Sequence, residues 1–254
     1  MSKTRKILLW TLIAYATFLC SWGAGMVISR TMASRFWSLL LFYAIYIAPF
    51  GLFLPLLVSR KFGIEPHKPR GKWRTIAGIG VFIVFIVFGV FFSDALPLIS
   101  ANPPTLAIII KYLLLFIPMG LGITLQCFFL IPRLTENKLG SGWWSAVIAV
   151  IASGLALGVC FFVDRFFDAA PMKEVIEVSA TMGALGLVCG TGALLTRSVY
   201  ITAPVFITVM VLNTLSEAKY FDESWGALIA GFLLSALAVV LPLLIIKKPG
   251  RKFA

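Results

Sequence analysis

The sequence has few of the side chains that usually catalyse reactions or bind metals. Histidine occurs once, at His67, and Asp and Glu together number only 10 of the 254 residues. The four cysteines, Cys20, Cys127, Cys160 and Cys189, lie far apart and form no CxxC-type pair. Metal sites need thiolate or imidazole groups close together. We therefore expect no metal site and no cofactor, and we interpret the cysteines as small buried residues.

Charged residues are also few, at 13% of the chain, whereas 60% of the residues are hydrophobic and the mean hydropathy is +1.00. A water-soluble protein could not cover so much apolar surface, so these values indicate an integral membrane protein. Crossing a bilayer core about 30 Å thick takes about 20 mostly apolar residues per helix, and backbone groups in lipid must be paired internally, which favours helices. The sequence therefore predicts an all-α, polytopic membrane protein with about eight transmembrane helices. They lie near residues 7–28, 36–58, 75–93, 106–131, 142–163, 176–195, 199–216 and 225–246.

The distribution of charge along the chain predicts an orientation. Most of the 22 Lys and Arg residues lie near the two ends of the chain, in the loops at 60–74 and 133–138, and at position 197. Most of the acids lie in the alternate loops. Basic residues in short loops stay on the cytoplasmic side. We therefore expect both termini inside (N-in/C-in) in a multi-pass protein of the cell (cytoplasmic) membrane.

The net charge of +12 follows from the same pattern. The loop at 60–74 carries the densest basic patch, which suits the anionic lipid of an inner membrane surface. The chain has no soluble segment that could read bases, so we expect the lipid bilayer and no nucleic acid as a partner. The loops are short and no internal repeat is visible. Residues 1–254 are therefore predicted to form a single membrane domain.

Three stretches carry a likeness to a known family. They are GITLQCFFLIPRL (122–134), WWSAVIAVIASGLALG (143–158) and GALGLVCGTGALLTRSVYITAPVF (183–206). In order and spacing they resemble the CAAX prenyl protease and bacteriocin-processing (CPBP, or Abi) family of intramembrane proteases. The likeness covers about residues 105–235, and residues 1–104 would form preceding transmembrane helices. The end of the second helix, RKFGIEP, also resembles the segment that usually precedes these motifs in the family.

The resemblance implies an intramembrane peptidase, but this sequence lacks the family's catalytic groups. In the family, one helix carries a glutamate pair and an arginine, the next carries Phe and His, and a later one carries His and Asn or Asp. A glutamate there activates water for peptide hydrolysis. Aligning the PRL motif and the later helices places seven other residues at those positions, here called the aligned positions: Gly122, Ile123, Cys127, Gly154, Gly158, Phe206 and Met210. Ile123 and Cys127 share a helix face, and we expect them to face an apolar pocket bordered by Gly158 and Phe206.

The hydrophobic interior contains few polar residues that could form a binding pocket. Lys111 is the ionisable residue within it, and its long stem could snorkel to the interface. Alternatively, Lys111 could pair with an acid such as Asp94 or Asp164, or contact an anionic ligand. Gln126 and Asn213 are typical of hydrogen bonds between membrane helices, and with Lys111 they could line a polar pocket.

Because a general base must reach the reacting water, the missing groups favour a degenerate, non-catalytic member of the family, a pseudoenzyme. We expect it to bind a membrane protein, a peptide or a lipid-linked ligand, as a scaffold, regulator or immunity protein. Two alternatives remain. One is an active protease with a divergent site. The other is a secondary transporter or permease component, which would use broken helices at the Pro- and Gly-containing segments 46–55, 117–122 and 201–206.

Overall fold

The computed structural model describes residues 3–66, 71–92, 103–139, 142–217 and 223–245. Within these ranges the chain folds into helices without strands, as the sequence predicts. Two long helices change from α to π geometry and back, so each is described in three parts: α2 (Arg35–Phe42), η1 (Tyr43–Phe53) and α3 (Leu54–Phe62), and then α6 (Leu106–Ile123), η2 (Thr124–Leu130) and α7 (Ile131–Leu139). The other helices are α1 (Lys3–Thr31), α4 (Lys72–Phe92), α8 (Trp143–Phe167), α9 (Met172–Thr196), α10 (Val199–Glu217) and α11 (Trp225–Ile245).

Several of these helices suit a bilayer. In the described part of the chain, six are long and apolar enough to cross one: Leu8–Ile28, Arg35–Phe62, Leu106–Arg133, Trp143–Phe167, Met172–Thr196 and Trp225–Pro242. The chain is thus a multi-pass membrane protein by length and composition. The other two expected spans correspond to α4 and to α10, whose apolar stretch Val199–Leu212 is shorter. The count of eight and the N-in/C-in orientation remain predictions.

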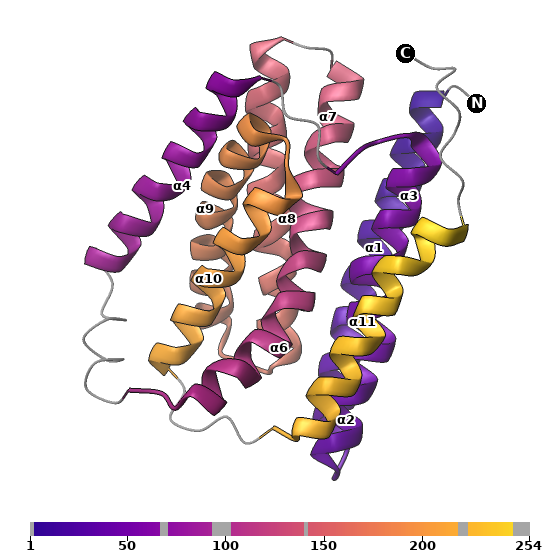
Figure 1. The fold of residues 1–254 in the computed structure, drawn as a ribbon, viewed down its shortest axis with the longest axis vertical. Helices are drawn as coiled ribbons and strands as arrows, with labels where there is room; N and C mark the ends of the chain where they lie inside the picture. The colour runs from indigo at the N-terminus through magenta and orange to yellow at the C-terminus, as the bar shows by residue number, and fades with distance from the viewer. Residues whose placement is uncertain (1–2, 67–70, 93–102, 140–141, 218–222, 246–254) are drawn as a thin grey trace.

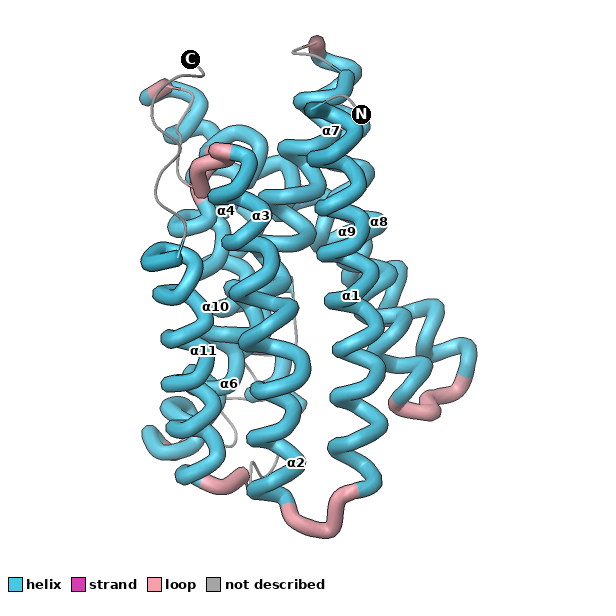
Figure 2. The backbone as a smooth tube through the Cα atoms, turned by 90° about the vertical axis from the view of Figure 1, so that its right-hand side faces the viewer, coloured by secondary structure: helices cyan, strands magenta, loops and turns pink. Residues whose placement is uncertain are grey.

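The helices run along the long axis of the molecule, and successive helices alternate in direction (Figures 1 and 2). We use the term basic end for the end at which α3 and α7 finish and α4, α8 and α10 begin (Figure 1). Trp73, Trp143 and Trp144 are exposed at the basic end, and Trp37 and Trp225 are exposed at the opposite end. Tryptophans concentrate at the two membrane–water interfaces, and these rings lie near the two ends of the long helices, as that preference predicts.

Each π segment ends two residues before a proline. Pro55 is the second residue of α3, and Pro132 is the second residue of α7. Proline has no backbone N–H and its ring crowds the preceding turn, so a wider turn of π type relieves the conflict without breaking the helix. The helices therefore remain continuous through these segments.

The carbonyls that prolines leave without a helical partner are bound by side chains from neighbouring helices. Leu54 N–H donates to Pro49 O, five residues earlier, as in a π-helix. In the same register Pro55 would pair with Phe50 O, but it has no N–H. Gln126 Nε2 donates to Phe50 O instead, at 3.0 Å. Similarly, Pro118 cannot donate to Leu114 O four residues earlier, and Tyr43 Oη donates to that oxygen at 3.0 Å. Two of the proline-containing segments, 46–55 and 117–122, thus form helix–helix contacts.

Small residues bring two pairs of helices into close contact. A Cβ atom at Gly122 would lie 3.1 Å from Gly51 Cα, so η1 and α6 cross backbone to backbone. Along the α8–α9 contact, a Cβ at Gly186 would lie 2.9 Å from Gly154 Cα. Interfaces between membrane helices favour such small residues because packing, not apolar burial, holds them together.

Candidate functional site

The seven aligned positions divide over four helix contacts. Ile123 and Cys127 are fully buried, and Cys127 Sγ lies 3.8 Å from Cys160 Sγ of α8. The Tyr15 hydroxyl of α1 lies 3.7 Å from the same Cys160 sulfur and donates to Ala156 O at 2.6 Å. This face of α6 and η2 is therefore packed against α1 and α8.

The other aligned positions lie in different contacts. Gly122 meets Gly51, as described above, whereas Gly154 and Gly158 face α9, where a Cβ at Gly158 would lie 3.1 Å from Ser179 O. Phe206 is fully buried on α10, with its ring centre 5.5 Å from that of Phe128 in an edge-on arrangement. Met210 lies one turn further along α10 and is 7% exposed. Each of these residues fills a helix contact, and the expected pocket around Ile123 and Cys127 stays a prediction.

The polar residues selected from the sequence also lie apart. Lys111 Nζ donates to Glu223 O at 2.6 Å and lies 5.4 Å from the centre of the Trp225 ring. This position is at the end of the bundle opposite the basic end. Gln126 is buried and bonded to Phe50 O, so it connects η2 to η1.

The acids considered as partners for Lys111 are placed differently. Asp164 accepts a hydrogen bond from Trp22 Nε1 at 3.0 Å, and Asp94 lies outside the described residues. Asn213 belongs to α10, but its side chain is outside the described part of the structure. The described residues therefore do not bring Lys111 and Gln126 into one polar pocket.

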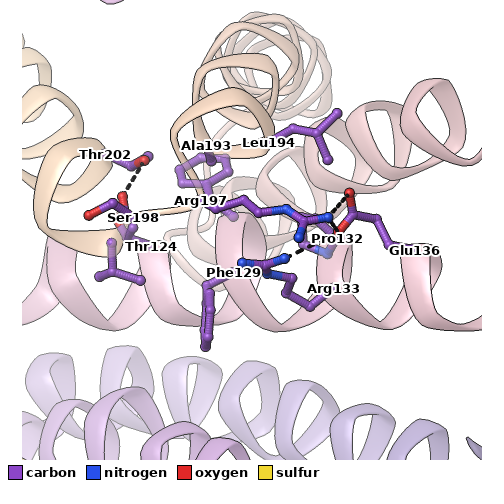
Figure 3. Close-up of a pocket in the computed structure, with 12 residues that line it drawn as sticks. Thr124, Phe129, Pro132, Arg133, Glu136, Ala193, Leu194, Arg197, Ser198 and Thr202 are labelled. Carbon is purple, nitrogen blue, oxygen red and sulfur yellow. Dashed lines mark hydrogen bonds and ion pairs between the residues drawn. The ribbon is translucent and has the colours of Figure 1, made fainter. Parts of the chain in front are cut away.

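A different set of residues, which sequence reasoning missed, forms a groove at the basic end between the η2–α7 helix and the α9–α10 turn (Figure 3). We call it the charged groove. It encloses about 310 Å³ of empty space, counting its open mouth, and its packed interior admits little more than water. Arg133, Glu136 and Arg197 lie toward one side, and Thr124, Ser198 and Thr202 toward the other (Figure 3). Apolar side chains, including Phe128, Phe129 and Leu194, complete the lining.

Two arginines share one carboxylate in the charged groove. Arg197 Nη2 lies 2.9 Å from Glu136 Oε1 and 2.7 Å from Oε2, and Arg133 Nη1 lies 3.4 Å from Oε2. The side chains of Arg133, Glu136 and Arg197 are 13%, 9% and 17% exposed. In such partly dehydrated surroundings an ion pair is screened less by solvent than on an open surface. Together the three side chains carry a formal charge of +1.

The backbone holds these side chains in place. Arg133 and Glu136 are three residues apart on α7, so they share a helix face. Arg197 ends α9 in the left-handed conformation, with φ 49° and ψ 35°, and its N–H donates to Ala193 O at 2.8 Å. A non-glycine residue in this conformation costs about 1 kcal/mol or more. The next helix is anchored by Val199 N–H, which donates to Pro66 O at 3.0 Å.

Some donors in the charged groove have no partner among the described residues. They are Arg197 Nε and the hydroxyl of Thr124, a side chain that is 0% exposed. Leaving a buried donor unpaired costs about 1–3 kcal/mol. The groove therefore has hydrogen-bonding capacity that Glu136 does not use.

The spacing of charged residues in the sequence carries a signal for part of this site. Arg133 and Arg197 were counted among the basic residues of the predicted cytoplasmic loops. Glu136 is an acid in a loop region dominated by basic residues, three positions after an arginine, and this spacing marks a helix-face pair. The contact with Arg197 could not be read in the same way because it depends on how α7 packs near α9.

No protein-family model matches the chain, and neither a curated protein nor a solved structure matches it. The resemblance to the CPBP family therefore stays a prediction. Within the described ranges, no three His, Cys, Asp or Glu side chains are grouped as a metal site would require.

Proposed function

We propose that the protein is a non-catalytic binding protein of the cytoplasmic membrane, built on a CPBP-like scaffold of about eight N-in/C-in spans. In this proposal it holds a membrane protein, a peptide or a lipid-linked ligand and acts as a scaffold, regulator or immunity protein. One observation carries the proposal. Among the described residues, the buried side chains with polar or ionisable groups include serines, threonines, tyrosines, cysteines and Gln126, and none is Asp, Glu, His, Lys or Arg.

Peptide hydrolysis has chemical requirements that the described interior of the protein does not visibly meet. Hydrolysis needs a group that can take a proton from water within hydrogen-bond reach. Ser153 donates to Ala149 O of its own helix at 2.9 Å, which is a structural bond with no base beside it. Reactive thiols usually lie next to cations, whereas the polar groups next to Cys127 and Cys160 are each other and the Tyr15 hydroxyl. The interior thus supports binding better than peptide cleavage.

The first test is a peptidase assay. The purified protein in liposomes is incubated with prenylated and leader-type peptides, and we expect no cleavage. Cleavage that disappears in Cys127→Ser would overturn the non-catalytic proposal and indicate a divergent nucleophile.

The second test looks for the bound partner in the membrane. A photo-crosslinking amino acid replaces Leu194, which lines the charged groove, or Leu237 of α11, which is 58% exposed. We expect a defined adduct from position 194 and only bulk lipid adducts from position 237. Identical adducts from both positions would contradict a binding role for the groove.

A further inference from the structure

The turn between α9 and α10, residues 197–199, is held against the charged groove at an energetic cost. Arg197 adopts the left-handed conformation, with φ 49° and ψ 35°, which is unfavourable for a residue with a Cβ atom. Arg197 Nε and the Thr124 hydroxyl, which both belong to residues lining the groove, are buried without a hydrogen-bond partner among the described residues. Both costs would fall if the turn moved outward and water entered the groove.

One ion pair opposes this movement. Arg197 Nη2 lies 2.9 Å and 2.7 Å from the two carboxylate oxygens of Glu136. The pair therefore joins the turn to α7, a helix that α8 and α9 separate from it in sequence. The two side chains are only 17% and 9% exposed, and breaking an ion pair that is largely shielded from water is unfavourable. The pair thus favours the closed turn, whereas the backbone conformation and the unpaired donors favour an open one.

We propose that the 197–199 turn is a latch over the charged groove, which the Arg197–Glu136 pair holds closed and whose release admits water to the groove from the basic end. Ser198 belongs to the turn and lies toward the same side of the groove as Thr124 (Figure 3). Thr124 is 0% exposed in the closed structure, so an outward movement of the turn would uncover it. The inference goes beyond the proposed function, because the latch would control access to the groove whether or not a partner binds there.

The experiment measures how fast a small, charged methanethiosulfonate reagent modifies the Thr124→Cys variant, purified in a neutral detergent. Mass spectrometry of peptides separates position 124 from the native cysteines. Thr124→Cys alone should react slowly, because the side chain at this position is buried. Adding Arg197→Gln or Glu136→Gln should speed modification at position 124 by about tenfold or more, as expected for the loss of an ion pair that is largely shielded from water.

Two comparisons test the pair itself. Combining Arg197→Gln with Glu136→Gln should give a rate no higher than that of the faster single variant, because both changes break the same contact. Rates that multiply in the combined variant would overturn the latch. The matched control, Arg165→Gln, removes an arginine at the opposite end of the bundle that pairs with Glu174. It should leave the rate at position 124 unchanged, and an equal acceleration would also overturn the proposal.

The native Cys160 and Cys189, both 0% exposed and outside the groove, report whether each variant keeps its fold. If they react faster in step with position 124, the pair supports the whole fold and the latch is overturned. Glu136→Asp keeps the charge and shortens the side chain, so it should disturb the fold less than Glu136→Gln and speed modification at position 124 by a smaller factor. An unchanged rate at this position in the Glu136 variants that fold would overturn the proposal.

Discussion

Replacing Gly186 of α9 with alanine tests the close approach of the α8 and α9 backbones. The added Cβ would lie 2.9 Å from Gly154 Cα, 3.0 Å from Leu157 Cβ and 3.1 Å from Ser153 O. Carbon atoms pack best at about 3.5–4.0 Å, and two of these three atoms belong to backbone that cannot rotate away. The helices must therefore separate by a substantial fraction of an ångström along this contact.

Gly183→Ala, one turn earlier on α9, is the matched control. A Cβ there would lie 3.5 Å from Gly154 O and 3.9 Å from Gly158 Cα, both ordinary contacts. Both substitutions gain the same helix propensity, about 1 kcal/mol, so their difference isolates the steric effect. Overpacking typically costs about 1–3 kcal/mol. We therefore expect Gly186→Ala to be less stable than Gly183→Ala by about this amount.

The assay is equilibrium unfolding of the purified variants in mixed detergent–SDS micelles, followed by circular dichroism and by the retention of monodisperse protein on gel filtration. The free energies of unfolding of Gly183→Ala and the wild type should agree within about 1 kcal/mol. If Gly186→Ala and Gly183→Ala unfold at the same SDS fraction, α8 and α9 do not approach as closely as described, and the placement of Gly154 against α9 must be revised.

Three further predictions follow from the packing and the charge pattern. In a Cys20→Ser, Cys189→Ser background, a membrane-permeant oxidant should join Cys127 to Cys160 within one chain, because their sulfurs lie 3.8 Å apart; mass spectrometry should detect the cross-link, and dimers alone would contradict this packing. Gln126→Leu should lower the free energy of unfolding by about 1–3 kcal/mol, since it leaves Phe50 O unpaired, whereas Thr191→Val, which removes an exposed bond within one helix, should be nearly neutral in the same titration. A topology reporter in the loop at 62–72 should be cytoplasmic and one at 218–224 external, and finding both on one side would refute the predicted orientation.

The helices could be predicted from sequence because uninterrupted apolar length is a local property. Their ends were less accurate, since hydropathy marks the part inside lipid while the helix continues into the interface. The sixth run was expected at 176–195, but α9 begins at Met172 and includes Lys173 and Glu174, which are charged residues of its first turn. Likewise, the fourth run was expected to end at 131, and α7 continues to Leu139.

The site was harder to predict because it depends on which helix faces meet. The small residues at Gly154 and Gly158 indicate close packing, but the sequence does not specify that α9 is the neighbour. Arg197 and Glu136 are separated by the whole of α8 and α9, so only the three-dimensional arrangement brings them together. The resemblance to the CPBP family directed attention to Ile123 and Cys127, which the structure buries. It directed attention away from Arg133 and Glu136, which lie six and nine residues after Cys127 on the same helix.

The backbone carbonyls that proline leaves without a helical N–H partner should make distant positions of the chain covary among relatives. Gln126 has an acceptor at Phe50 because Pro55 provides no N–H, and Tyr43 has one at Leu114 because Pro118 provides none. A homologue with another residue at position 55 or 118 could satisfy that carbonyl within its own helix, and the need for an amide at 126 or a phenol at 43 would relax. Residues 55 and 126, and residues 43 and 118, are therefore expected to change together among relatives, although neither pair is close in sequence.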